Sequence, residues 1–197
     1  YVMFSTASSP ISAMGSRNSP VPVQVGSGIP TKIRDYVYCL PFNDFDAVEQ
    51  CLNDHHGEIA ALLVEPCLGN IVGIEPKDGF LQHLRNLCDK YNVVLIFDEV
   101  KTGFRLSNGG ARETYEVIPD ISTYAKSLGN GVPVAAFGGK SEVMNVIGGG
   151  SVAHAGTFGG NGVSMSAANA VLDILNEAPV LKELSIRGRK LKKGMDN

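Results

Sequence analysis

Hydrophobic and polar positions alternate along the chain in two patterns. Short, nearly continuous apolar runs are typical of buried strands, and they predict strands at residues 36–40, 59–64, 93–97, 121–124 and 132–137. Apolar residues at helical spacing lie between and after these runs, and they predict helices around residues 45–52, 80–88, 141–147, 164–175 and 179–192. Strands that alternate with helices predict an α/β fold with a mostly parallel sheet and flanking helices.

The first segment of the chain lacks this regularity. Residues 5–30 are rich in Ser, Gly and Pro, so residues 1–35 are expected to form a loop. Residues 36–178 carry the strands and helices of a large domain, and residues 179–197 begin a C-terminal helix or small domain. The chain starts at Tyr1 rather than Met, and its last helix looks interrupted. We therefore expect a partial chain whose large domain is incomplete at its N-terminus.

Composition and charge narrow the range of partners. The 197 residues are 44% hydrophobic and 19% charged, as in an ordinary soluble globular protein. The net charge of −3 argues against binding to nucleic acid or an anionic membrane, and the longest apolar run, residues 59–64, is too short to span a bilayer. Four cysteines without a CxxC pair are typical of reduced thiols in a cytoplasmic or organelle-matrix protein. The four histidines lack the spacing of a metal site.

Three charged residues follow the ends of predicted strands. Glu65 comes directly after residues 59–64, Asp98 after residues 93–97, and Lys126 shortly after the strand that ends at Tyr124. Ligands of parallel α/β sheets bind beyond the carboxyl ends of the strands, so we expect these side chains to gather at a ligand site. Taken singly, Asp98 equally suits a helix cap or a loop salt bridge, and Lys126 suits a surface turn.

Together, Asp98 and Lys126 suit the cofactor pyridoxal 5′-phosphate (PLP). A carboxylate at the edge of a dry sheet needs a partner, and a protonated pyridine nitrogen is a suitable one. Lys126 lies just before the Gly-rich turn Gly129-Asn130-Gly131. Its amine can form an imine with the cofactor and can later carry a proton.

A second Gly-rich segment, residues 154–161, leads into the helix predicted to begin near Ser164. Free N–H groups at a helix start, together with the Thr157 hydroxyl next to Gly156, would make an anion site that fits a phosphate. Taken alone, such a turn is equally typical of a flexible connection.

In their order and spacing, these motifs resemble the class III (ω-type) aminotransferases, which are fold-type I PLP-dependent enzymes. Within that class the chain most resembles the glutamate-1-semialdehyde 2,1-aminomutases and their close aminotransferase relatives. The resemblance covers roughly residues 30–185. Its motifs are Leu63-Val64-Glu65-Pro66 with Gly69-Asn70, Leu95 through Arg105, Gly109-Gly110-Ala111, Pro119-Asp120-Ile121, Ala125-Lys126, Gly138-Gly139-Lys140, and Ala155-Gly156-Thr157 with Asn161.

The resemblance implies a role for each candidate residue. Lys126 matches the lysine that forms the Schiff base, and Asp98 matches the partner of the pyridine nitrogen. Val100 matches the residue that packs on one face of the ring. Asn70 matches the asparagine near the ring hydroxyl, and Glu65 lies near the site. Residues 36–178 then correspond to a PLP-binding large domain.

The Gly-rich segment carries a further implication. Thr157, with Gly156 beside it, matches the threonine that reaches the cofactor phosphate of the neighbouring subunit, which implies a homodimer with shared active sites. The family's own phosphate cradle and the aromatic residue that stacks on the cofactor would lie before Tyr1. The small C-terminal domain would follow Asn197.

The implied activity is amino-group transfer to or from a small amino or keto substrate, either between molecules (a transferase) or within one molecule (an isomerase). A truncated or degenerate homologue that keeps the fold for dimerisation is the alternative. A nucleotide-binding domain is disfavoured, because no GxGxxG follows a first strand and Val134 stands where a P-loop before Lys140 would need glycine.

Overall fold

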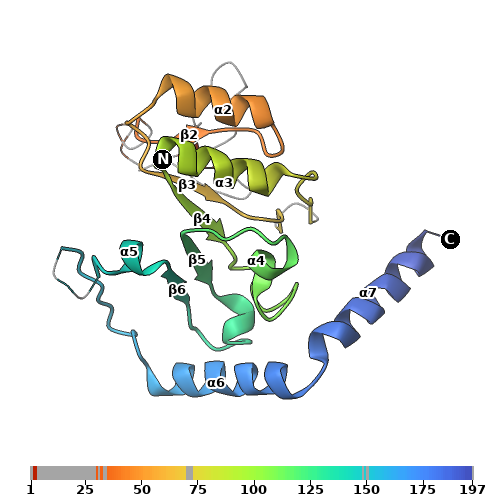
Figure 1. Ribbon diagram of the computed structural model, residues 1–197. Helices are drawn as coiled ribbons and strands as arrows, with labels where there is room; N and C mark the ends of the chain where they lie inside the picture. Colours follow the sequence, from red (N-terminus) through yellow and green to blue (C-terminus); the bar gives the residue numbers. More distant parts are fainter. Residues whose placement is uncertain are drawn as a thin grey trace.

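One sheet organises the described part of the chain (Figure 1), which comprises residues 2–3, 30, 32, 35–69, 73–147, 149 and 151–196 of a computed structural model. Within these residues the spatial order of strands is β2-β1-β3-β4-β5-β6, and all neighbouring strands run parallel except β5 and β6. The strands are β1 Val2–Met3, β2 Tyr38–Cys39, β3 Ala61–Val64, β4 Val94–Asp98, β5 Ile121–Tyr124 and β6 Ala136–Gly139. The predicted α/β fold with a mostly parallel sheet is confirmed. The loop predicted for residues 1–35 is wrong at Val2–Met3, which form β1 between β2 and β3, and most of the other residues of this segment lie outside the described residues.

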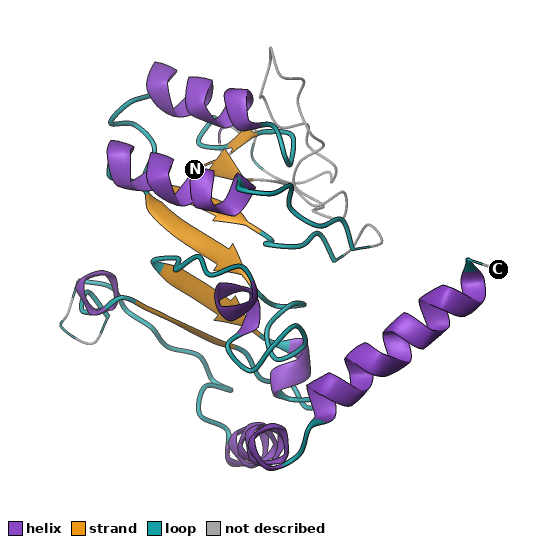
Figure 2. Cartoon of the chain, turned by 45° about the vertical axis from the view of Figure 1, so that its right-hand side comes forward, coloured by secondary structure: helices purple, strands orange, loops and turns teal. Residues whose placement is uncertain are grey.

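Helices α2 (Phe45–Asp54) and α3 (Phe80–Tyr91) lie side by side on one face of the sheet (Figure 1, Figure 2). The core lies between them and the central strands, where Leu62 pairs with Leu95 and Val64 with Phe97, all fully buried. Complete burial of such a side chain contributes about 1.5–3 kcal/mol. The helices contribute the apolar faces predicted from their spacing, namely Val48, Cys51, Leu52, Phe80, Leu81, Leu84, Leu87 and Cys88.

Polar residues determine where these two helices begin and end. The Asp44 side chain accepts a hydrogen bond from the Ala47 N–H at 3.1 Å and so caps α2. Helix α3 ends at Asn92, whose φ of 55° lies in the left-handed region that asparagine adopts more readily than most residues.

The last strand differs from its prediction. Strand β6 covers Ala136–Gly139 rather than residues 132–137. Pro133, which has no backbone N–H to donate to a neighbouring strand, precedes it, and the Pro133 carbonyl accepts a hydrogen bond from Ser164 Oγ at 2.8 Å. The segment before Ala136 is therefore held by helix α6 (Gly162–Glu177), to which Ser164 belongs, and does not pair with β5.

A short helix, α4 (Gly110–Thr114), has no counterpart among the predicted helices. Its start is held by Glu99, which is fully buried and whose Oε2 accepts hydrogen bonds from the Ala111 N–H at 2.5 Å and the Thr102 hydroxyl at 3.3 Å. Burial raises the pKa of Glu99 although these bonds oppose the rise. Five residues are too few to show an apolar period, so a buried carboxylate and not a hydrophobic face defines this helix.

The C-terminal part of the chain lies apart from the α2–α3 layer (Figure 1). Helix α5 (Ser141–Met144) follows β6, and α6 (Gly162–Glu177) packs against the 3-10 helix η1 (Lys126–Leu128). The buried residues of α6 are Ser164 and Ala168, whereas Met165 is 40% exposed. Helix α7 (Val180–Met195), described in full, buries none of its residues.

Candidate active site

The structure places Glu65, Asp98 and Lys126 at the same edge of the sheet. Strands β3, β4 and β5 are neighbours and run parallel, so their carboxyl ends lie together. Glu65 follows β3 directly, Asp98 is the last residue of β4, and Lys126 comes two residues after β5. The sheet topology therefore brings these three residues to one edge, as expected from their positions after predicted strands.

Asp98 is half-buried, and one of its oxygens is held by two donors. Asp98 Oδ1 accepts a hydrogen bond from the Val100 N–H at 3.0 Å and from the Thr123 hydroxyl at 3.4 Å. Among the described residues no donor contacts Oδ2. The carboxylate is therefore anchored on one side and open on the other.

Glu65 closes the turn that follows β3. Its Oε2 accepts a hydrogen bond from the Gly69 N–H at 2.9 Å. Burial raises the pKa of Glu65, and the nearby charge of Asp98 raises it further, while the Gly69 hydrogen bond and the charges of Lys101 and Lys126 oppose the rise. The net direction is upward, and the four charged groups lie within electrostatic reach of one another.

Lys126 begins the 3-10 helix η1 in an uncommon backbone conformation. Its φ is 42°, in the left-handed region that residues other than glycine seldom adopt. Such conformations cost about 1–3 kcal/mol and collect at functional sites. The side chain is exposed and makes no ion pair or hydrogen bond with the described residues.

Of the two remaining residues predicted near the cofactor ring, the structure describes Val100 but not Asn70. Val100 is half-buried in the turn after β4, and its backbone N–H contacts Asp98, a contact that the sequence did not indicate. Asn70 lies outside the described residues.

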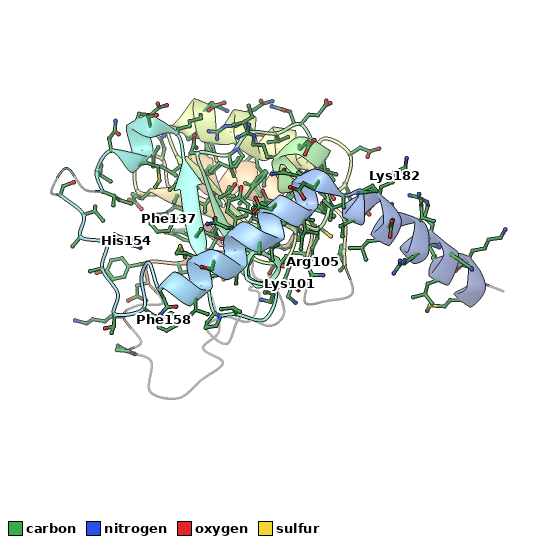
Figure 3. The ribbon with its side chains drawn as sticks, turned by 90° about the horizontal axis from the view of Figure 1, so that it is seen from below. Lys101, Arg105, Phe137, His154, Phe158 and Lys182 are labelled. Atoms are coloured by element: carbon green, nitrogen blue, oxygen red, sulfur yellow. The ribbon has the colours of Figure 1, made fainter. Side chains whose placement is uncertain are left out.

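The Gly-rich segment is surface-exposed. Gly156 and Thr157 are both exposed, and Thr157 makes no hydrogen bond to Lys126 or Asp98 within the described chain. At the first residue of the segment, the ring of His154 lies 5.1 Å from the ring of Phe137 in an edge-to-face contact that joins the segment to β6 (Figure 3).

The structure corrects the prediction that the N–H groups at the start of α6 are free. Asn161 caps this helix, and its Oδ1 accepts hydrogen bonds from the N–H groups of Val163 at 3.1 Å and Ser164 at 3.2 Å. Because the side chain of Asn161 already satisfies them, these two N–H groups are not available to a phosphate.

Sequence reasoning assigned no role to Thr123, near the carboxyl end of β5, or to Asp120, just before the amino end of that strand. Thr123 contacts Asp98 through its hydroxyl. The sequence indicated only that Thr123 lies in a strand, where side chains point alternately to the two faces of the sheet. Asp120 belongs to a motif that was recognised, yet its contacts were not expected. It accepts hydrogen bonds from Arg85 and from the backbone of Leu95.

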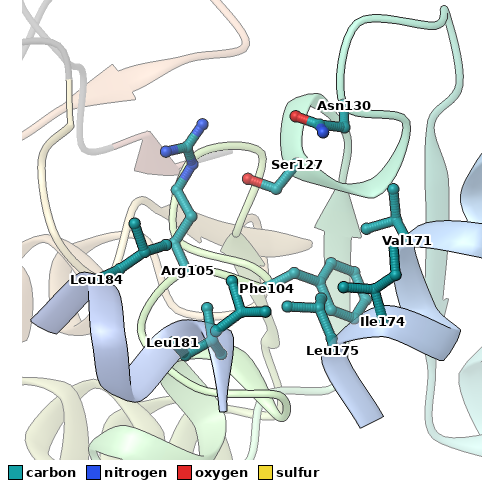
Figure 4. A pocket seen from close by; sticks show the side chains of 10 residues that line it. Phe104, Arg105, Ser127, Asn130, Val171, Ile174, Leu175, Leu181 and Leu184 are labelled. Carbon is teal, nitrogen blue, oxygen red and sulfur yellow. The ribbon is translucent and has the colours of Figure 1, made fainter. Parts of the chain in front are cut away.

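A cavity of about 190 Å³ lies beside the η1 turn (Figure 4). Arg105, Ser127 and Asn130 line one side of it, and apolar side chains of α6 and α7, such as Leu175 and Leu184, line the other. Ser127 Oγ is buried and has no hydrogen-bond partner among the described residues. The cavity therefore combines an apolar wall with polar groups directly after Lys126.

The described residues carry neither a metal-binding cluster nor a helix that could span a membrane. They contain no cluster of three or more His, Cys, Asp or Glu side chains placed to hold a metal ion. None of the helices in the described ranges is long and apolar enough to cross a membrane. Cys39, Cys51 and Cys88 are buried free thiols, and Cys67 is a half-buried one.

Comparison with known proteins identifies the family. The family model "Aminotransferase class-III" matches residues 29–197. A glutamate-1-semialdehyde 2,1-aminomutase from Thermodesulfovibrio yellowstonii is 42% identical over 182 residues, which are 92% of this chain and 43% of that protein. The chain thus spans less than half the length of this relative.

Solved structures agree with this assignment. An omega-transaminase from Sphaerobacter thermophilus is 39% identical with a TM-score of 0.74, and the match covers 79% of this chain and 36% of that one. The FumI protein of Sphingopyxis sp. MTA144, in its PLP internal aldimine form, is 25% identical with a TM-score of 0.84, covering 99% of this chain and 45% of that one. The chain belongs to the class III aminotransferase family.

Proposed function

We propose that this chain is the catalytic part of a PLP-dependent enzyme that transfers an amino group. The observation that carries the proposal is the placement of Asp98 and Lys126 at the ends of two neighbouring parallel strands. A carboxylate and a free amine at that edge are the two groups that this cofactor needs from the protein.

The residues present fit the cofactor. Asp98 Oδ1 is held by Val100 and Thr123, and Oδ2 has no donor within the described chain, so it is open to the N–H of a protonated pyridine ring. The Lys126 amine is exposed and free of ion pairs among the described residues. When bound, PLP supplies an aldehyde carbon that reacts with amines and a ring that accepts electrons.

Each residue then has a defined task. Lys126 attaches the cofactor, and its released amine moves a proton. Asp98 keeps a positive charge on the ring nitrogen, because a carboxylate partner stabilises the protonated form. Val100 would pack on one face of the ring, and Asn70, which lies outside the described residues, would correspond to the family's asparagine near the ring hydroxyl. Glu65, with its raised pKa, retains a proton more readily than an ordinary glutamate and so limits negative charge beside Asp98.

The substrate class follows from the family and not from a substrate pocket. Relatives include an aminomutase and an omega-transaminase. We therefore propose a small amino or keto compound as substrate, with the amino group moved either between molecules or within one molecule.

We further propose that two copies of the chain form a homodimer in which Gly156 and Thr157 contact the cofactor phosphate of the partner. Both are exposed and reach no other candidate residue of their own chain among those described. Large apolar side chains are exposed on the same part of the surface, including Phe158 at 57% and Val163 at 72%. Exposed apolar patches of this kind mark protein interfaces.

The decisive experiment for the cofactor is chemical labelling. Protein produced from the whole gene is mixed with PLP, reduced with borohydride and mapped by peptide mass spectrometry. A pyridoxyl label on Lys126 is expected, and Lys126→Ala should remove it. The matched control is Lys182→Ala, which removes an exposed lysine of α7 (Figure 3) and should leave the label on Lys126. A label on another lysine, or none, would favour a non-catalytic homologue.

The homodimer is tested by mixing variants. Lys126→Ala and Thr157→Ala chains are purified separately and then combined. If each site takes Lys126 from one chain and Thr157 from the other, the mixture should regain up to about a quarter of the wild-type activity, because a random half of dimers is mixed and each has one intact site. No recovery in a mixture that exchanges subunits would contradict shared sites.

A further inference from the structure

Thr123 lies where the two strands of the proposed site meet. The strand register pairs Thr123 with Asp98, so both side chains leave the same face of the sheet. The Thr123 carbonyl accepts a hydrogen bond from the Glu99 N–H at 3.0 Å, and its hydroxyl contacts Asp98 Oδ1 at 3.4 Å. Lys126 follows three residues later. Thr123 therefore holds the end of β4 with both its backbone and its side chain.

The two donors to Asp98 act on the same oxygen. The Val100 N–H and the Thr123 hydroxyl both donate to Oδ1, and neither donates to Oδ2. A carboxylate held through one oxygen by two donors loses the freedom to rotate about its last torsion, which is otherwise broad. Its second oxygen then points in a fixed direction.

We propose that Thr123 is a positioning residue for the ring-nitrogen contact: with the Val100 N–H it fixes Oδ1 of Asp98 and so presents Oδ2 to the cofactor. The inference rests on the proposed function. The Val100 N–H is backbone and is present in every variant, so Thr123 is the part of this pair that a side-chain substitution removes. At 3.4 Å the hydroxyl contact is long, so its loss should weaken PLP binding by a moderate factor of about 3 to 10.

The test compares two ligands and three variants of the protein produced from the whole gene. The ligands are PLP and 1-deazapyridoxal 5′-phosphate, in which a C–H replaces the ring nitrogen. Thr123→Val removes the hydroxyl and keeps the shape, and Thr123→Ser restores a hydroxyl. Dissociation constants come from absorbance titration, and thermal unfolding of the protein without ligand reports on the fold.

Thr102→Val is the matched control. The Thr102 hydroxyl donates to Glu99 Oε2 at 3.3 Å, a contact of the same kind to the adjacent carboxylate, which is buried and holds α4. This variant should lower the thermal stability of the protein and affect both ligands equally.

We expect Thr123→Val to weaken PLP binding about 3- to 10-fold and binding of the nitrogen-free analogue by less than about twofold, because only PLP can use Asp98. Thr123→Ser should return PLP binding to within about twofold of wild type. Equal losses for both ligands would show a general structural role and overturn the inference, as would unchanged PLP binding. A wild-type protein that binds PLP but carries no label on Lys126 would overturn the proposed function instead, and one that binds neither ligand would overturn both.

Discussion

The guanidinium of Arg85 and the carboxylate of Asp120 form a buried ion pair, with Nη1 2.8 Å from Oδ2. The same oxygen accepts the Leu95 N–H at 2.7 Å, and Oδ1 lies 2.7 Å from Lys140 Nζ. Burial alone would raise the pKa of Asp120, but Lys140, the Leu95 N–H and Arg85 outweigh it and the pKa lies below its ordinary range. Asp120 thus joins α3, β4 and the end of β6.

Asp120→Asn should lower the free energy of unfolding by about 1.5–3 kcal/mol, because it keeps the size of the side chain but removes the buried anion, while the Arg85 guanidinium keeps its ion pair with Asp89 at 2.7 Å. Urea denaturation at pH 7 measures the change. Asp196→Asn is the control, since Asp196 pairs with Lys192 on the exposed surface and its loss should leave the urea midpoint unchanged. Equal effects of the two substitutions would contradict the role of Asp120.

The same pair predicts a loss of stability in acid. Because its pKa is lowered on folding, Asp120 binds a proton less tightly in the folded than in the unfolded chain, and its contribution is complete above the ordinary aspartate value of about 3.9. The contribution is lost as the pH falls from there through the folded pKa. Unfolding measured from pH 6 to pH 2 should show a steeper acid decline in wild type than in Asp120→Asn, and parallel curves would be inconsistent with it.

Two adjacent glycines of β6 should respond differently to substitution. A Cβ at Gly139 would lie 2.0 Å from the Asp120 carbonyl oxygen, whereas one at Gly138 meets no atom within 4 Å. Gly139→Ala should therefore destabilise the protein by about 1–3 kcal/mol, since strand β6 has to move away from β5. Gly138→Ala serves as the control and should change stability by less than about 0.5 kcal/mol. Thermal unfolding of both variants checks the difference.

Much of the fold followed from the spacing of apolar residues, because the elements that form the core show that spacing clearly. Helices α2 and α3 and strands β3 to β5 were predicted within about three residues of their bounds. Helix α4 was not predicted, because the buried carboxylate of Glu99 defines it, and β6 was displaced because Pro133 cannot pair. Local spacing contains neither kind of information.

The candidate site was also predictable only in part from the sequence. Strand ends placed Glu65, Asp98 and Lys126 together, since a parallel sheet brings all its carboxyl ends to one edge. The contact of Thr123 with Asp98 could not be predicted, because it depends on the register of two strands that are far apart in sequence. Similarly, nothing in the Gly-rich segment indicated that Asn161 would occupy the helix start.

Asn161→Ala should unfold the first turn of α6. The Asn161 side chain caps the N–H groups of Val163 and Ser164, and loss of such a cap costs about 1 kcal/mol. Amide hydrogen exchange at these two residues should accelerate. Asn161→Asp keeps the acceptor and should preserve protection. Asn108→Ala, which removes a contact to the Leu175 carbonyl at the other end of α6, should not affect the helix start; if it does, the cap is not specific.

Glu65 predicts a pH dependence of the opposite sign to that of Asp120. Its pKa is raised on folding, so the folded chain binds the proton more tightly than the unfolded chain. Stability should therefore fall as the pH rises above the ordinary glutamate value of about 4.3, up to the folded pKa. Glu65→Gln keeps an acceptor for the Gly69 N–H but cannot titrate, so it should be more stable relative to wild type at pH 7 than at pH 4. A constant difference between the two proteins across this range would contradict the prediction.

The core described above is distributed unevenly along the chain. Its buried apolar residues lie between residues 39 and 117, and beyond that point the described residues add only Leu128 and Ala168. Segments with few buried contacts open at a lower free energy than the rest of a protein. We therefore expect the segment after β5, which carries Lys126, to open at a lower free energy than β4, which ends at Asp98. Local opening would then let the amine move while β4 and β5 stay paired.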